Sequence, residues 1–160
     1  MELRTDKIRA CFDRKIGNFT ELWNLSTNTN YVRCAPRDPL IELYGLKNGE
    51  RVKLSGHISD VVEAPDALIL SYDSFGEYDI SAKVTCRCEQ DRLAFSAEIC
   101  NHSTIDVTEI LMPHLGGIYL GNGQKDYLIY PHHAGDKTED PVYNYAENRL
   151  TFWRGCSVPF

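Results

Sequence analysis

Three of the five histidines, His114, His132 and His133, lie near the ends of predicted strands in one part of the sequence. An imidazole can donate a proton near neutral pH, and a carboxylate on a strand, such as Glu109, can accept one. Opening a sugar ring needs both steps. We favour structural or solvent-exposed histidines, and keep sugar contact and acid–base catalysis as alternatives. A metal site is disfavoured, because adjacent histidines on a strand point to opposite faces.

Aromatic side chains are the second group that could carry chemistry. Their apolar faces stack on the C–H faces of sugars, while neighbouring polar groups bind the hydroxyls. The candidates are Trp23, Tyr127, Tyr130, Tyr143, Tyr145 and Trp153. Packing in the core or at its rim is the simpler interpretation for any one of them. Taking both groups together, the predicted carbohydrate-binding residues are His114, Tyr127, His132, His133 and Trp153.

The sequence contains no complete catalytic signature. Acidic residues that might form a glycosidase pair fall in predicted turns, where a carboxylate is simply solvated. No motif supports a serine or cysteine nucleophile. The glycines at 116–117 and 121–123 are not phosphate loops, because no helix follows them. We therefore predict no catalytic residue, no metal and no cofactor in this chain.

Composition excludes several partners. The chain has 160 residues, a net charge of −6 and a hydrophobic content of 42%, with a pI near 5.3. A nucleic-acid partner would require a basic face, which this balance disfavours. No apolar run approaches the roughly 20 residues that cross a bilayer. The N-terminus lacks the apolar core of a signal peptide, so we expect a cytoplasmic protein with no membrane partner.

The six cysteines do not suggest a disulfide scaffold. Small secreted scaffolds are shorter and richer in cysteine. Cys86 and Cys88 lie two residues apart in an alternating segment, so their side chains share one face. We predict buried free thiols that pack as small hydrophobes, and keep a disulfide or a metal site as alternatives.

The hydrophobic periodicity is that of strands throughout the chain. Residues 78–89 alternate most clearly, with Ile80, Ala82 and Val84 on the same face as Cys86 and Cys88. Turn signals separate about ten such segments at the spacing of an antiparallel sandwich or barrel. The expected strands are 3–12, 19–25, 31–34, 40–46, 51–54, 57–63, 68–72, 78–89, 92–100 and 106–113. We predict an all-β, antiparallel β-sandwich in a single domain, 1–160, with little helix. After Pro131 we expect a long loop, and Leu150–Trp153 as a last short strand.

Three stretches carry a resemblance to a known family. FDRKIGNFTELWNLSTNTNYV resembles the opening hairpin of N-terminal β-sandwich domains of the galactose-mutarotase-like (supersandwich) type, which occur in large glycoside hydrolases. AEICNHSTIDVTEILMPHLGGIYLG resembles a later strand–loop–strand in those domains, and DYLIYPHHAGD the segment that follows. The matching positions are Phe12, Asp13, Gly17, Phe19, Leu22, Asn24, Thr27, Asn30 and Tyr31 in the first stretch, and Asn101, Ser103, Val107, Glu109, Ile110, Pro113, Leu115 and Gly117 in the second.

In such enzymes the sandwich precedes a (β/α)₈ barrel that carries the catalytic acids, and this chain contains no barrel. The resemblance therefore implies a non-catalytic domain, the N-terminal part of a larger glycoside hydrolase, which supports the missing barrel or contacts carbohydrate. A free-standing carbohydrate-binding module is the alternative, and a mutarotase-type sugar epimerase using Glu109 with one of the histidines is the least favoured. An apolar edge left by a missing barrel would also favour a homo-oligomer.

Overall fold

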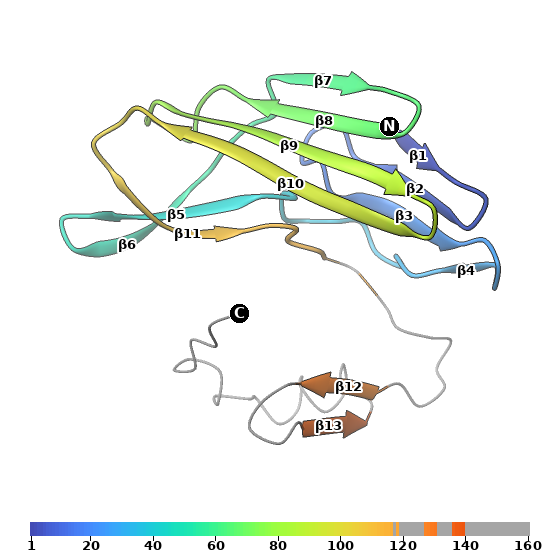
Figure 1. Ribbon diagram of the computed structural model, residues 1–160. Coiled ribbons are helices and arrows are strands. Elements are labelled where there is room, and N and C mark those ends of the chain that lie inside the picture. Colours follow the sequence, from blue (N-terminus) through green and yellow to red (C-terminus); the bar gives the residue numbers. More distant parts are fainter. Residues whose placement is uncertain (117, 119–126, 131–135, 140–160) are drawn as a thin grey trace. The chain divides into compact units, whose positions relative to one another are not determined.

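The computed structural model describes residues 1–116, 118, 127–130 and 136–139. Contacts between Cα positions divide the chain into two compact units, Met1–Tyr119 and Leu120–Phe160. Figure 1 shows that the first unit is built from antiparallel strands.

The first sheet of this unit contains β1 (Glu2–Arg4), β2 (Ile8–Phe12), β3 (Phe19–Asn24) and β4 (Thr29–Asn30), in that order. The single strand predicted over residues 3–12 is wrong: β1 and β2 form a hairpin. Thr5 turns the chain, because its hydroxyl oxygen accepts hydrogen bonds from the backbone N–H groups of Lys7 (3.3 Å) and Ile8 (3.1 Å). Leu3 then lies opposite Ala10, and both side chains are buried.

The second sheet has the order β10-β9-β8-β7. Its strands are β7 (Asp60–Glu63), β8 (Ala67–Tyr72), β9 (Ile80–Glu89) and β10 (Arg92–Asn101). The predicted alternation in β9 is confirmed, because every second residue from Ile80 to Cys88 is buried. Gln90 closes the β9–β10 hairpin with a φ of 50°. Cys86 and Cys88 are buried free thiols, as predicted.

The third sheet has the order β11-β5-β6 and contains β5 (Glu42–Lys47), β6 (Glu50–Leu54) and β11 (Asp106–Leu111). Asn48 and Gly49 join β5 to β6 with φ angles of 54° and 82°. Two positive φ angles define the turn that suits the twist of a two-residue hairpin, and Asn-Gly is its preferred sequence. A bulge between Val107 and Glu109 shifts the register of β11 on β5.

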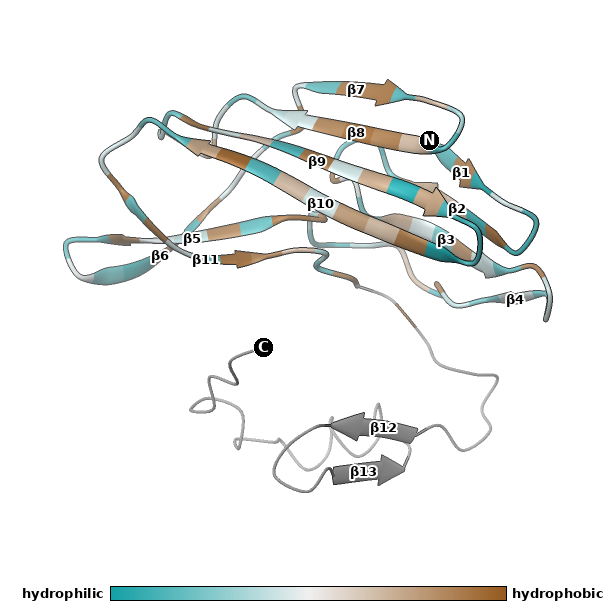
Figure 2. Cartoon of the chain, in the orientation of Figure 1, coloured by the Kyte–Doolittle hydropathy of each residue, from teal (hydrophilic) through white to brown (hydrophobic). Residues whose placement is uncertain are grey.

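Apolar residues of all three sheets form one core. Phe19 of β3 meets Phe12 of β2 at a ring distance of 4.8 Å and Phe95 of β10 at 6.2 Å. The second contact joins the inner faces of two sheets, which is the packing of a sandwich. Figure 2 shows the apolar residues along β8 and alternating along β9 and β10. The prediction of an all-β antiparallel fold is confirmed, and no helix occurs in the described part of the chain.

The second unit contains β12 (Tyr127–Tyr130) and β13 (Asp136–Glu139), which pair antiparallel. The aromatic segment YLIY thus forms a strand. The long loop predicted after Pro131 is wrong at residues 136–139, where DKTE forms β13. Backbone pairing with β12 makes this segment a strand, although its polar sequence shows no alternation of apolar and polar residues. The region predicted as a last strand, Leu150–Trp153, lies outside the described residues.

A membrane-spanning helix would have to be both long and apolar. No helix of that kind occurs among the residues that the structure describes.

Candidate functional site

Of the five residues predicted to bind carbohydrate, the structure describes two. His114 follows β11 in the first unit, and Tyr127 begins β12 in the second, opposite Glu139. His132, His133 and Trp153 lie outside the described residues. The grouping of all five therefore stays a prediction, and His114 is the member that the first unit contains.

Backbone hydrogen bonds hold His114 in place on both sides. Its N–H donates to the carbonyl oxygen of Leu40 at 2.8 Å. Its carbonyl oxygen accepts from Nδ2 of Asn18 at 2.8 Å, and the same amide nitrogen donates to the carbonyl oxygen of Asp38 at 2.9 Å. Asn18 is completely buried. This amide therefore joins the chain after β11 to the loop before β5, and removing it would take a hydrogen-bond donor from two partly buried carbonyl groups.

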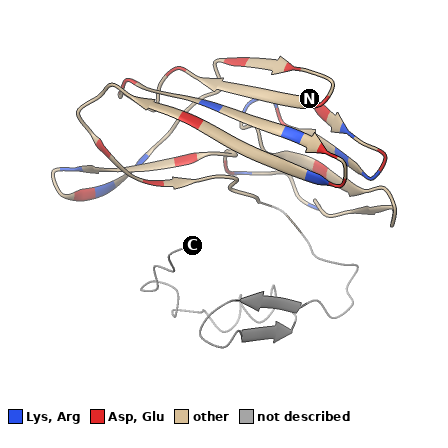
Figure 3. Ribbon diagram, in the orientation of Figure 1, with Lys and Arg blue, Asp and Glu red and all other residues tan. Residues whose placement is uncertain are grey.

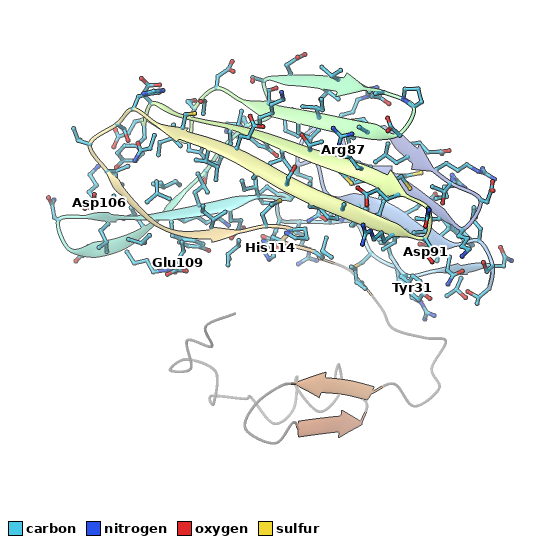
Figure 4. All side chains as sticks on the ribbon, in the orientation of Figure 1. Tyr31, Arg87, Asp91, Asp106, Glu109 and His114 are labelled. Atoms are coloured by element: carbon cyan, nitrogen blue, oxygen red, sulfur yellow. The ribbon has the colours of Figure 1, made fainter. Side chains whose placement is uncertain are left out.

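The side chain of His114 lies beside a buried acid. Its Nδ1 is 3.4 Å from Oε1 of Glu42, a contact that does not have hydrogen-bond geometry. Glu42 is only 3% exposed. Glu109, the carboxylate weighed as a base, instead forms a bidentate ion pair with Arg51, at 2.9 and 2.8 Å. The carboxylate next to His114 is thus Glu42, which no sequence motif singles out. Figure 4 shows Glu109 and His114 at separate places near β11.

Three polar side chains lie around Glu42, those of His114, Lys53 and Tyr44. Lys53 of β6 forms a short ion pair with it, and the Tyr44 hydroxyl donates to its Oε2 at 3.0 Å. Burial acts to raise the pKa of Glu42, but the hydrogen bonds from Lys53 and Tyr44 outweigh burial and hold the pKa below its usual value. Glu42 is therefore ionised, and the positive charge of Lys53 compensates its negative charge. This arrangement fits a structural role better than proton transfer.

A cavity of about 420 Å³ opens between the first sheet and the β9–β10 hairpin. We call it the aromatic cavity. Its apolar wall includes Phe19, Leu22, Leu93 and Phe95, and its polar margin Lys7, Asn24, Tyr31, Asp91 and Arg92. Figure 4 places Tyr31 and Asp91 at the same end of the first unit. Trp23, one of the aromatic residues singled out in the sequence, also lines it.

Ion pairs and a hydrogen bond hold several of the polar side chains at the margin of the aromatic cavity in place. Lys7 in the β1–β2 turn lies 3.5 Å from Asp91 in the β9–β10 turn, so that one ion pair joins two hairpins. Arg92 pairs with Glu89 at 2.7 Å. The indole N–H of Trp23 donates to Glu21 at 2.8 Å. These exposed ion pairs contribute little to stability, but they position donors and acceptors beside an apolar wall.

A second cavity of about 220 Å³ lies where the loop before β5 meets β6 and the end of β8. We call it the basic cavity, because Lys15, Arg37 and Lys53 contribute to its lining. Tyr72 lines it as well, is 2% exposed, and its hydroxyl has no hydrogen-bond partner among the described residues. Burial raises the pKa of Tyr72 to about 12, so the hydroxyl keeps its proton. Leaving such a group unpartnered costs about 1–3 kcal/mol.

The described residues offer no alternative chemistry. No group of three or more His, Cys, Asp and Glu side chains in this part of the chain could hold a metal ion. Burial raises the pKa of the Cys86 thiol to about 12, which leaves it protonated and unreactive at neutral pH. Sequence reasoning missed Lys7, Asp91 and Arg92 because charged residues in a turn or at the start of a strand are ordinary surface residues. The fold brings the β1–β2 turn and the β9–β10 turn together, and no feature of the sequence predicts that these two turns meet.

Comparisons with protein-family models, with curated proteins and with solved structures found no match to this chain.

Proposed function

We propose that the first unit is a non-catalytic β-sandwich domain of a carbohydrate-active enzyme and contacts carbohydrate through the aromatic cavity. The observation that carries this proposal is the composition of that cavity. Aromatic and aliphatic side chains form its wall, and charged and amide groups stand at its margin. Apolar walls with a few convergent polar groups are typical of small-molecule sites.

The proposed ligand follows from this arrangement. A sugar ring has an apolar C–H face, which stacks on aromatic side chains, and hydroxyl groups, which need donors and acceptors at its edge. Tyr31 and Trp23 contribute aromatic surface, while Asn24 and Asp91 contribute acceptors, and Lys7 and Arg92 contribute donors. A volume of about 420 Å³ accommodates one or two sugar rings.

The same cavity argues for binding without catalysis. Among the described residues that line it, Asp91 is the only carboxylate, and Lys7 is its ion-pair partner. Hydrolysis of a glycosidic bond ordinarily uses two carboxyl groups about 5–10 Å apart. A binding domain needs no such pair.

A second candidate function is support of a catalytic domain, as the family resemblance implies. Exposed apolar side chains gather near the edge strand β11 and favour it. They are Leu46 (42% exposed), Ile110 (51%), Leu111 (41%) and Leu115 (40%). In the described part of the sheet β11 pairs only with β5, so its other edge has backbone groups available for a partner.

A glycan array followed by calorimetry tests the first proposal. We expect saturable binding that Tyr31→Ala and Arg92→Ala weaken at least tenfold. Arg87→Ala is the matched control, because Arg87 is an exposed arginine of the same hairpin that does not line the cavity. Trp153→Ala and His132→Ala test the residues predicted from the sequence. Binding lost in those two variants alone would move the carbohydrate site away from the aromatic cavity.

The second candidate is tested by sedimentation. If no glycan binds, and the protein forms a concentration-dependent dimer that Ile110→Lys abolishes, the apolar surface beside β11 is an interaction surface. A monomer at every concentration, with the same sedimentation coefficient in the Ile110→Lys variant, would count against it.

A further inference from the structure

We propose that the basic cavity is a second binding site, which takes the oxyanion group of a small ligand, either a carboxylate or a phosphate. This inference does not depend on the aromatic cavity, which lies at other turns of the first unit. It rests on the charges around the basic cavity and on the size of the space.

The charge at this cavity is positive, although the whole chain carries −6. Lys15, Arg37 and Lys53 line it, and among the described residues only two carboxylates, Asp38 and Glu42, join them. Lys53 and Glu42 neutralise each other through their ion pair. Lys15 and Arg37 have no ion-pair partner in the described part of the chain, so their charge is available at the entrance. An oxyanion is the ligand that two cations favour, and a guanidinium binds it in bidentate geometry.

The volume limits the size of the ligand. A space of about 220 Å³ equals the share of roughly seven water molecules at about 30 Å³ each. Inorganic phosphate fits within it, and so does a single sugar acid. A longer oligosaccharide or a nucleotide would extend out of the cavity.

Titration of the full-length chain with inorganic phosphate and with glucuronate, followed by NMR at constant ionic strength, tests the proposal. We expect at least one of the two to bind saturably and to shift the signals of Gly56 and His57, which line the cavity. Sodium chloride at the same ionic strength should give no saturable shift. Phosphate binding alone would assign a phosphate ligand, and glucuronate binding alone a carboxylate ligand.

Variants then locate the site. We expect Arg37→Ala to weaken binding at least fivefold. Arg87→Ala, an exposed arginine outside the cavity, should leave binding unchanged. Saturation by neither anion, or equal weakening by Arg37→Ala and Arg87→Ala, would overturn the proposal.

Discussion

The second and third sheets of the first unit are stabilised in different ways. In the second sheet, β8 contains no charged residue and β9 alternates between buried and accessible positions. In the third sheet, β5 and β6 carry charges of both signs, and one of the acids, Glu42, is buried. Figure 3 shows β8 without charged residues, whereas its neighbours β7 and β9 carry some. Apolar burial therefore stabilises one sheet, and the other adds a polar network on its outward side.

The comparison shows what burial means for each side chain. Leu70 in β8 is buried because its apolar side chain gains free energy when it leaves water. Glu42 in β5 is buried among polar partners, which are Lys53, Tyr44 and His114. A buried leucine contributes in proportion to its apolar area. A buried carboxylate contributes only as long as its partners remain, since its desolvation opposes folding.

The largest effect is expected from removing apolar volume in the second sheet. Leu70→Ala should lower the free energy of unfolding by about 3 kcal/mol, because it removes buried methyl groups and leaves a cavity. Ile69→Ala, on the other face of the same strand and only partly buried, should lower it by about 1 kcal/mol. Urea unfolding measures both. Equal losses would show that the two faces of β8 do not differ as described.

The next effect is expected from breaking the ion pair in the third sheet. Lys53→Met leaves the carboxylate of Glu42 without its main partner and should cost about 2 kcal/mol in urea unfolding. This is below the loss for a fully buried pair, because the Lys53 side chain is 42% exposed. Combining it with Glu42→Leu should restore most of the lost stability. A double variant as unstable as Lys53→Met would contradict the idea that an unpaired charge causes the loss.

A smaller effect is expected from pH. The pKa of Glu42 is lower in the folded protein than its usual value of 4.5. Its contribution to stability is therefore complete above about that pH and is lost as the pH falls through the folded pKa. Urea unfolding between neutral and acidic pH should show a shallower decline for Glu42→Gln than for the original protein. The lowered pKa values of Glu77 and Glu109, beside Lys47 and Arg51, remain in both proteins. Parallel declines would mean that the pKa of Glu42 is not lowered.

The smallest effect is expected from the exposed polar network. Arg51→Ala removes the bidentate ion pair with Glu109 and the contact 3.6 Å from the centre of the Tyr44 ring. Both partners are accessible to water, so the free energy of unfolding should stay within the error of the urea measurement. A loss as large as that of Lys53→Met would show that the outward network acts as one unit with Glu42.

The second sheet could be predicted from the sequence because each of its signals is local. Period-two alternation places Ile80, Val84 and Cys88 on one face, and this is a consequence of strand geometry alone. The Asn48-Gly49 turn is local in the same way. The β1–β2 hairpin was missed because its turn at residues 5–7 contains no glycine or proline. The strand β13 was missed because its sequence is polar throughout and only pairing with β12 makes it a strand.

The candidate sites were predicted less completely, because they depend on residues far apart in the sequence. Trp23 was among the aromatic candidates because of its type, whereas Tyr31 was not predicted as a binding residue. Lys7, Asp91 and Arg92 gain significance only when two hairpin turns meet. The least favoured alternative paired Glu109 with one of the histidines, but the carboxylate beside His114 is that of Glu42, which belongs to a different strand.

The sequence by itself determined the strand periodicity, the hairpin turns and the all-β class, because these follow from the alternation and the backbone preferences of neighbouring residues. Only the tertiary structure decided which charges meet. Glu42 is buried beside Lys53 because β5 pairs with β6, and it meets His114 because Asn18 and Leu40 hold the chain after β11. Electrostatic interactions act through space and depend on distance, and distances between separate segments are set only when the sheets pack together.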